Sequence, residues 1–325
     1  MPGCTGGSIT LSAARNILCL LVTLILKPGK KYTGSLIQKE HSIIVLLFLI
    51  CSLGNANNIL VCAAENFYGN VSEMIGGKFV KVTSIISNPN ADPHLFSTSP
   101  NTAITISKAQ VIIYNGADYD PWMIQFLSSR QMDDKLAIIN VTELVGMKKG
   151  SNPHIWYKPD TFPKLASLLA KKFSEIDPEN RTYFQENLDS FNEKYKKVYA
   201  LIGSIKSNFS GTNVIATEPI FGYMSDALEF NMRGKKFQQI IMNGSEPSPN
   251  ITADFIDELK SRTIKILYYN NQATNPTTEN ILNMARQDNI KIIGVSETMS
   301  GHQNVIQWLT KTLEDTQQAL IIKSH

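Results

Sequence analysis

Short apolar runs rich in β-branched residues alternate, from Ile59 onward, with longer segments whose apolar residues recur every three or four positions. Four runs occur before residue 150, and they read ILVCAAE, FVKVTSIIS, AQVIIYN and KLAIINV. Four more occur after residue 210, and they read NVIAT, FQQIIM, IKILYYN and IKIIGV. Runs of this kind predict strands, and strands that alternate with helices predict parallel sheets covered on both faces. We therefore expect an α/β fold with two similar lobes, each a four-stranded, mainly parallel sheet with flanking helices.

One long helical pattern separates the two sets of runs. Asp177 is a suitable N-cap, Pro178 suits the first helical position, and apolar residues then recur at three- and four-residue spacing. The pattern predicts one rigid helix over residues 177–208, about 48 Å long at 1.5 Å per residue. We expect this helix to bridge an N-terminal lobe (57–176) and a C-terminal lobe (209–325), allowing small tilts and resisting wide opening.

Residues 1–56 differ from the rest of the chain. They carry five Lys or Arg and one Glu, and the apolar run SIIVLLFLICSLG, which follows several lysines, ends in the small residues GNA. This order is typical of an export signal, and the run is shorter than the roughly 20 residues of a membrane span. We expect a leader over residues 1–56, cleaved after Ala56, and a periplasmic protein. An uncleaved anchor is the alternative.

A second apolar run, ILCLLVTLIL, lies upstream of the first, and one exported chain does not need two. We therefore expect translation to start further downstream, so that residues 1 to about 35 are not part of the precursor. Three of the four cysteines lie in the leader, which leaves Cys62 and no internal disulfide. Cys51 is a poor candidate for lipidation, because the bulky Leu49 and Ile50 precede it.

The composition narrows the class of protein. At 325 residues and 43% hydrophobic, the chain is long enough for two lobes with buried cores. The net charge of +3 arises in the leader, since 26 basic and 27 acidic groups remain after it. A nearly neutral protein has no electrostatic reason to bind nucleic acid.

Two histidines stand out because each follows a proline in the loop after a predicted strand. His94 lies in NPNADPHLFSTSP and His154 lies in SNPHIWYKP. Proline fixes its own φ and restricts the residue before it, so it stiffens the approach to the histidine. A stiff loop suits a metal ligand, because a metal–nitrogen bond near 2.1 Å tolerates little error.

Two carboxylates occupy matching positions in the second lobe. Glu218 follows one predicted strand and precedes Pro219, and Glu297 follows the last strand. Ligands of doubly wound sheets bind at the carboxyl ends of the strands. Two imidazoles and two carboxylates could therefore face one another across the cleft, with a formal charge of −2 that balances a divalent cation.

Each of these residues also has a structural interpretation. A single histidine near an apolar run is more often a hydrogen-bonded structural group, and Glu218 or Glu297 could cap the helix that follows it. His302 competes with Glu297 for the ligand role, and we expect it to be a solvated loop residue. Gln272 also leaves a strand end, where a neutral amide suits a hydrogen bond to a ligand better than a metal bond.

Several motifs together resemble the zinc/manganese receptor family of ABC importers, over residues 59–320. They read NPNADPHLFSTSPNTAITISKAQVIIYNGADYDPWM, NPHIWYKPDTFPKLASLLA, TEPIFGYMSDAL and IKIIGVSETM. The resemblance implies two α/β lobes bridged by one long helix, and it implies His94, His154 and Glu218 as metal ligands. The family commonly has Asp at the fourth ligand, where this chain has Glu297. Many zinc receptors also insert a histidine-rich loop, which residues 143–152 lack.

The resemblance further implies Zn²⁺ or Mn²⁺ as bound cargo, a monomer, and delivery of the ion to an ABC transporter membrane permease. A metal-dependent hydrolase is the alternative from another class, because two histidines and carboxylates can activate water. The chain has no His-Glu-x-x-His motif, so we expect no enzyme. A surface adhesin of the same family is a third alternative.

Overall fold

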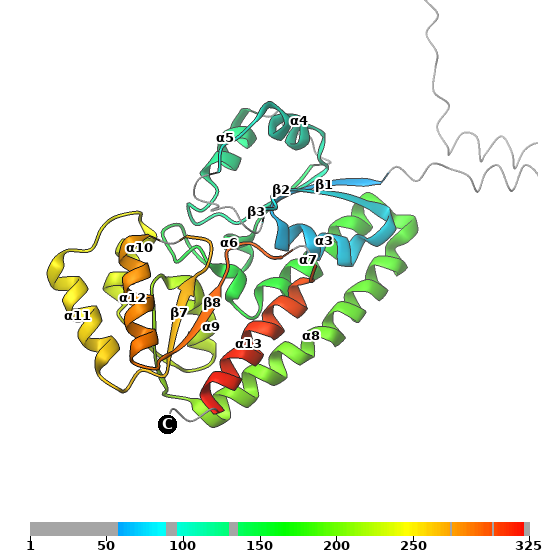
Figure 1. Cartoon of the computed structure of the whole chain (residues 1–325). Coiled ribbons are helices and arrows are strands. Elements are labelled where there is room, and N and C mark those ends of the chain that lie inside the picture. Colours follow the sequence, from blue (N-terminus) through cyan, green and yellow to red (C-terminus); the bar gives the residue numbers. More distant parts are fainter. Residues whose placement is uncertain (1–57, 89–95, 130–135, 274, 301, 322–325) are drawn as a thin grey trace, which may run out of the picture. The chain divides into compact units, whose positions relative to one another are not determined.

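The computed structural model describes residues 58–88, 96–129, 136–273, 275–300 and 302–321 (Figure 1). The predicted leader, its cleavage after Ala56 and His94 lie outside these ranges. Within the described ranges, no helix is both long and apolar enough to span a bilayer.

The first sheet has four parallel strands in the order β2-β1-β3-β4. Its strands are β1 (Ile59–Glu65), β2 (Val80–Ile86), β3 (Val111–Tyr114) and β4 (Ala137–Asn140). Its helices are α3 (Asn66–Gly76), α4 (Pro100–Lys108), α5 (Pro121–Ser129), α6 (Val141–Leu144) and α7 (Thr161–Ile176). Helix α3 packs closely on β2, and the close approach occurs at Gly69. Any larger residue would clash there, since a Cβ atom would lie 2.1 Å from the Ser84 hydroxyl oxygen. All four predicted strands of this lobe are present.

The second sheet repeats this order as β6-β5-β7-β8, again with every strand parallel. Its strands are β5 (Asn213–Ala216), β6 (Asn231–Arg233), β7 (Ile266–Asn270) and β8 (Lys291–Val295). Its helices are α9 (Gly222–Ala227), α10 (Lys235–Met242), α11 (Pro249–Lys260), α12 (Pro276–Gln287) and α13 (Val305–Ile321). The prediction of two similar four-stranded lobes is confirmed.

One predicted strand is wrong. The run FQQIIM belongs to helix α10, where Phe237 and Ile241 are buried one turn apart. A short apolar run does not reveal its period, so a buried helical turn can be mistaken for a strand. The strand at this place in the sheet is β6, an edge strand with two exposed residues, Asn231 and Arg233, and no hydrophobic signal.

The long bridging helix is confirmed. After a single 3₁₀ turn, η4 (Pro178–Asn180), α8 runs without interruption from Arg181 to Phe209. Asp177 does not cap it, because the Asp177 carboxylate accepts a bond from the Asn180 side chain instead (2.6 Å). Buried residues recur along one face of α8 at alternating four- and three-residue spacing: Phe184, Leu188, Phe191, Tyr195, Val198, Ile202 and Ile205. This stripe is why α8 can pack against α3, α7 and α13 along its length (Figure 1).

The two lobes share one hydrophobic core. A single cluster of buried residues includes Val61 of the first sheet and Val214 of the second. Aromatic rings join the lobes within it: Phe67 of α3 stacks on Trp308 of α13 at 5.7 Å between centroids, and Tyr157 lies 5.3 Å from Phe221. Because opening the lobes widely would expose this core, only small relative movements are favoured.

Two acidic side chains are buried together at the carboxyl end of β1. Glu65 has no exposed surface, and Asp120, just before α5, accepts bonds from the backbone N–H of Asn115 (2.6 Å) and Gly116 (2.8 Å). Burial raises the pKa of Asp120 to about 6, although these backbone bonds oppose the rise. Burial and then the charge of Asp120 raise the pKa of Glu65 well above its usual value. Glu65 therefore holds its proton where an exposed glutamate has lost it.

This pair predicts how stability depends on pH. A carboxyl whose pKa is raised by folding binds its proton more tightly in the native state, so stability falls as pH rises above the pKa of the unfolded chain. Glu65→Gln cannot lose a proton, and we expect it to gain stability relative to wild type by up to about 1.4 kcal/mol per pH unit above pH 5. Urea unfolding at a series of pH values measures this difference.

The exposed Glu73 on α3 offers a matched control. Glu73→Gln should follow the wild-type pH profile. If Glu65→Gln also follows it, Glu65 is ionised in the native state and this interpretation is wrong.

Candidate metal centre

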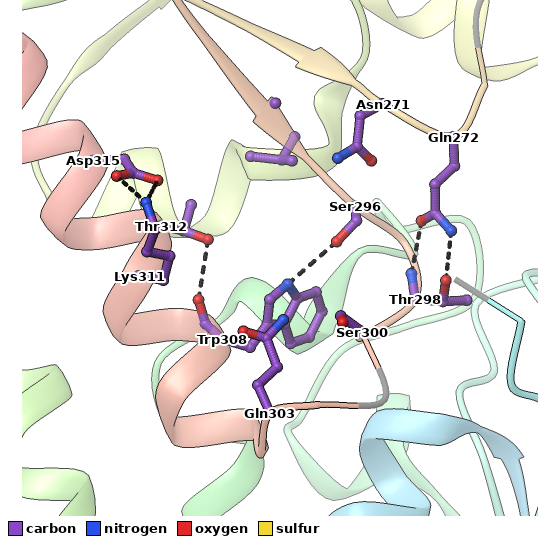
Figure 2. A pocket seen from close by; sticks show the side chains of 12 residues that line it. Asn271, Gln272, Ser296, Thr298, Ser300, Gln303, Trp308, Lys311, Thr312 and Asp315 are labelled. Carbon is purple, nitrogen blue, oxygen red and sulfur yellow. Dashed lines mark hydrogen bonds and ion pairs between the residues drawn. The ribbon is translucent and has the colours of Figure 1, made fainter. Parts of the chain in front are cut away.

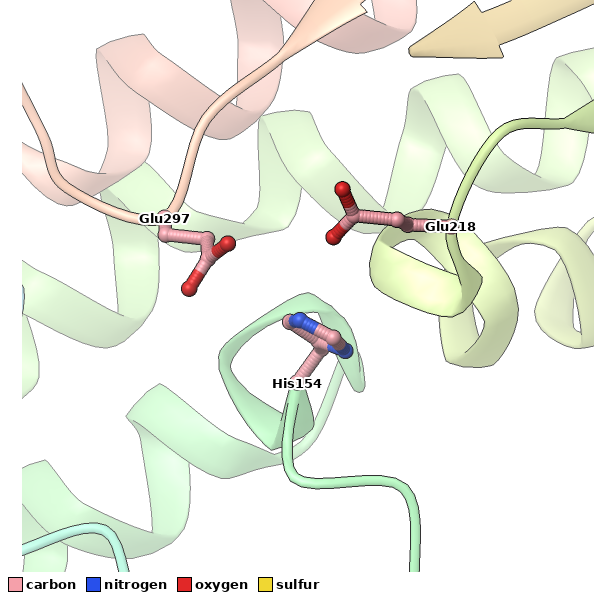
Figure 3. A group of neighbouring side chains, drawn as sticks. All are labelled: His154, Glu218 and Glu297. Atoms are coloured by element: carbon pink, nitrogen blue, oxygen red, sulfur yellow. The ribbon is translucent and has the colours of Figure 1, made fainter. Parts of the chain in front are cut away.

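Three acidic or imidazole side chains meet where the two lobes face each other (Figure 3). His154 immediately precedes the 3₁₀ turn η3 (Ile155–Tyr157) of the first lobe, while Glu218 follows β5 and Glu297 follows β8 in the second. One potential ligand atom from each lies within 4.8 Å of the others. His154 and Glu297 have no exposed surface, and Glu218 retains 3%. Of the four ligands predicted from the sequence, the structure brings these three together, and His94 lies outside the described residues.

Neutral hydrogen-bond donors orient the two carboxylates. Asn270, the last residue of β7, donates through Nδ2 to Glu297 Oε1 (2.5 Å) and to Glu218 Oε2 (3.3 Å). From the first lobe, the Tyr119 hydroxyl donates to Glu297 Oε2 (2.7 Å). These bonds fix the directions of the carboxylate oxygens, but neutral donors would not cancel the charges of two buried carboxylates in their ionised form.

A strained turn presents Tyr119 to the site. Gly116, Ala117 and Asp118 have φ values of 78°, 50° and 62°, a left-handed stretch that is unusual for the two residues with side chains. Bonds from the Asn115 and Gly116 amides to Asp120 close the turn. Burial and then the negative charge of Glu297 raise the pKa of Tyr119 well above its usual value, so its hydroxyl keeps the proton that it donates.

The ring of His154 is held in one orientation. Its Nδ1 lies 2.7 Å from Asn152 Oδ1, and an amide oxygen can only accept, so Nδ1 carries the proton. The Trp156 ring packs edge-on against the imidazole, with centroids 5.1 Å apart. Nε2 is then the nitrogen with a lone pair for a ligand, as in metal sites where a hydrogen bond to one nitrogen selects the other for the metal.

Gln272 lies beside the cluster and holds the backbone of the Glu297 loop. Its Oε1 accepts from the backbone N–H of Glu297 (2.6 Å) and Thr298 (2.9 Å), and its Nε2 donates to Thr298 Oγ1 (2.5 Å). Gln272 also lines a polar hollow of about 480 Å³ on the second lobe, together with Ser296 and Trp308 (Figure 2). None of the three clustered side chains lines that hollow, so it is separate from the cluster.

The alternative that Glu218 and Glu297 cap helices receives no support from the geometry. Glu218 occupies the N-cap position of η5 (Pro219–Phe221) without a capping bond from its side chain. Glu297 lies eight residues before the start of α13, too far to cap it. His302 is exposed and is not a member of the cluster.

Hydrogen bonds between the lobes surround the cluster. Asn66 of α3 pairs with the backbone of Met299 in both directions, at 2.6 and 3.0 Å. The Tyr157 hydroxyl donates to the carbonyl of Ser296 (3.1 Å). The loop that carries Glu297 is therefore bonded to the first lobe on both sides of the glutamate.

Sequence reasoning missed three residues that orient the clustered side chains, namely Tyr119, Asn152 and Asn270. Asn270 ends a buried strand, and a polar residue at that place could have been predicted from the sequence to belong to the site. Asn152 precedes Pro153-His154 in the quoted motif, but nothing in the sequence shows what its amide contacts. Tyr119 reaches Glu297 from 178 positions away, and only the folded structure reveals that contact.

Comparison with known proteins agrees with this fold. A family model described as the periplasmic component A of a zinc-uptake complex matches residues 61–319. The metal ABC transporter substrate-binding lipoprotein SloC of Streptococcus mutans is 24% identical over 237 residues, covering 68% of this chain and 76% of that protein. The manganese-binding lipoprotein MntA of Bacillus subtilis is 21% identical over 235 residues, covering 70% and 76%.

Among solved structures, the periplasmic zinc binding protein TroA from Treponema pallidum superimposes with a TM-score of 0.67 at 15% identity. The match covers 81% of this chain and 99% of that one, and it shows a shared fold. The family model spans nearly all of the described residues, which confirms the resemblance seen in the sequence. The chain therefore belongs to the family of periplasmic zinc-uptake components.

Proposed function

We propose that this protein is the extracytoplasmic solute-binding protein of an ABC importer, which captures a divalent transition metal between its lobes and delivers it to a membrane permease. The observation that carries this proposal is the convergence of His154, Glu218 and Glu297, from both lobes, within 4.8 Å of one another in a buried position. His94 is proposed as the fourth ligand, on the sequence pattern alone.

The donor set suits a divalent ion. Two adjacent buried carboxylates repel each other and lose the solvation that water would provide, so their ionised state needs a compensating charge. A cation of charge +2 balances both. Because its ligands come from both lobes, the bound ion would tie the lobes together and favour their closed arrangement.

Zinc and manganese are the metals that we propose. Imidazole nitrogen with carboxylate oxygen accepts either ion, and zinc binds such sets more tightly in the usual divalent order. One relative is named as a manganese-binding protein and one solved structure as a zinc-binding protein, and both metals are therefore reasonable cargo.

The remaining assignments follow from the family. A periplasmic location agrees with the description of the family model and with the predicted leader over residues 1–56. We retain the lobes 57–176 and 209–325, the bridging segment 177–208 and a monomeric state as proposals. The family's role in uptake argues against the metal-dependent hydrolase and the adhesin, and the hydrolase alternative would require turnover of esters or peptides by the zinc-loaded protein.

Removing one ligand should abolish most of the affinity. We expect His154→Ala and Glu218→Gln each to weaken zinc binding by at least about a hundredfold, since even changes to the partners of ligands cost ten- to a hundredfold. Titration of metal-free protein against a competing chelator measures the affinity. His302→Ala, at an exposed histidine outside the cluster, is the matched control and should bind like wild type.

The same titration decides the role of His94. A loss for His94→Ala comparable to that of His154→Ala would support its assignment as a ligand, and wild-type affinity would remove it from the site. Wild-type affinity for both His154→Ala and Glu218→Gln would contradict the proposed metal centre as a whole.

Bound metal should also stabilise the fold. Zinc at about a thousand times its dissociation constant adds roughly 4 kcal/mol to the unfolding free energy, which raises the melting temperature by about 10 °C. Chelation should reverse the shift. At the same zinc concentration, Glu218→Gln should show at most about a third of the wild-type shift, because a hundredfold weaker site is then only about ten times its dissociation constant. An equal shift in that variant would show that zinc stabilises the protein from another place.

A further inference from the structure

Both ends of the Asn152 side-chain amide make hydrogen bonds. The oxygen accepts from His154, a proposed metal ligand, and the nitrogen donates to the second lobe. We propose that Asn152 is a positioning residue that determines which nitrogen of His154 carries the proton. Through the same side chain, it couples this tautomer to the contact between the two lobes. This inference rests on the proposed metal-binding function, and it adds a residue that controls the site without contacting the ion.

On the first-lobe side, Asn152 Oδ1 receives two hydrogen bonds from His154. One comes from the backbone N–H (3.1 Å) and one from Nδ1 (2.7 Å). The backbone N–H can only donate, so it determines which end of the amide is the oxygen. That oxygen then requires a proton on Nδ1, which leaves the lone pair on Nε2.

On the second-lobe side, the same amide donates through Nδ2 to the carbonyl of Pro219 (2.7 Å). Pro219 directly follows Glu218, so the bond joins the loops that carry two of the proposed ligands. The Tyr223 hydroxyl of α9 donates to the backbone carbonyl of Asn152 (2.8 Å). A Cβ atom on Gly222 would lie only 3.1 Å from Asn152 Nδ2, so the second-lobe backbone lies directly against the amide.

The chemistry of this position requires an amide. One end of the side chain must accept a hydrogen bond from His154, and the other must donate one to the Pro219 carbonyl. Both ends must be at the same distance from the backbone. Aspartate could still accept from His154, but it would place a carboxylate oxygen against the Pro219 carbonyl. Leucine has a similar shape and can make neither bond. The two substitutions therefore separate the role in orienting the imidazole from the role in joining the lobes.

A consequence for metal release follows from these contacts. When the second lobe moves away, the Pro219 carbonyl leaves the amide, and Asn152 loses one of the contacts that hold its side chain in place. The orientation of His154 then becomes less fixed, and affinity for the ion falls. Metal binding and contact between the two lobes would thus favour each other through a single side chain.

The first measurement is made on the metal-free, ¹⁵N-labelled protein and does not depend on metal binding. Long-range ¹H–¹⁵N spectra show which imidazole nitrogen carries the proton, and His154→Ala identifies the His154 signals. We expect a proton on Nδ1 in wild type and in Asn152→Asp, and a mixture of both tautomers in Asn152→Leu. Melting curves establish that each variant is folded.

The second measurement is zinc affinity in the same proteins. We expect a loss of ten- to a hundredfold for Asn152→Leu and of about tenfold for Asn152→Asp. Tyr223→Phe removes only the hydroxyl bond to the Asn152 backbone, so it is the matched control, with the wild-type tautomer and a loss of about threefold.

Two results would overturn the proposal. One is the wild-type tautomer in folded Asn152→Leu, because His154 would then be oriented without the amide. The other is wild-type zinc affinity in Asn152→Asp, because the bond to Pro219 would then have no part in binding. A wild-type protein that binds neither zinc nor manganese would instead refute the proposed function, and the tautomer spectra would still decide whether Asn152 orients His154.

Discussion

Two carboxylates buried side by side are the constraint on which the rest of this structure depends. Glu218 and Glu297 are almost wholly removed from water, and their carboxyl groups lie close to each other and to His154. Such a pair is costly unless donors surround it and a positive charge joins it. The donors come from both lobes, Tyr119 from the first and Asn270 from the second, so the site is complete only when the lobes are together.

The architecture keeps the lobes together. Helix α8 bridges the two sheets, and α13 packs along it, while one hydrophobic cluster extends from the first sheet to the second. The aromatic contacts of Tyr157 and Phe67 with the second lobe lie in this cluster. A receptor built in this way can adjust the distance between its ligands without exposing its core. Small displacements are sufficient, because metal–ligand bonds weaken over a few tenths of an ångström.

Much of the fold was predictable because periodicity is a local property. The pattern correctly placed seven of the eight predicted strands and the long helix. Strand β6 was not predicted, because an exposed edge strand has no apolar alternation. Glu218 and Glu297 were predicted from their positions at strand ends, and His154 from its Pro-His motif in a loop after a strand. The partners that orient them were not, because Tyr119 and Asn270 contact glutamates that only folding brings near, and nothing in the sequence shows what the Asn152 amide contacts.

The central claim is that one ion is held by side chains of both lobes. Anomalous diffraction from crystals of the zinc-loaded protein, recorded at the zinc absorption edge, tests it most directly. We expect a strong peak about 2.0–2.2 Å from His154 Nε2 and from an oxygen of both Glu218 and Glu297. A zinc peak bound by residues of a single lobe, or one outside this cluster, would contradict it.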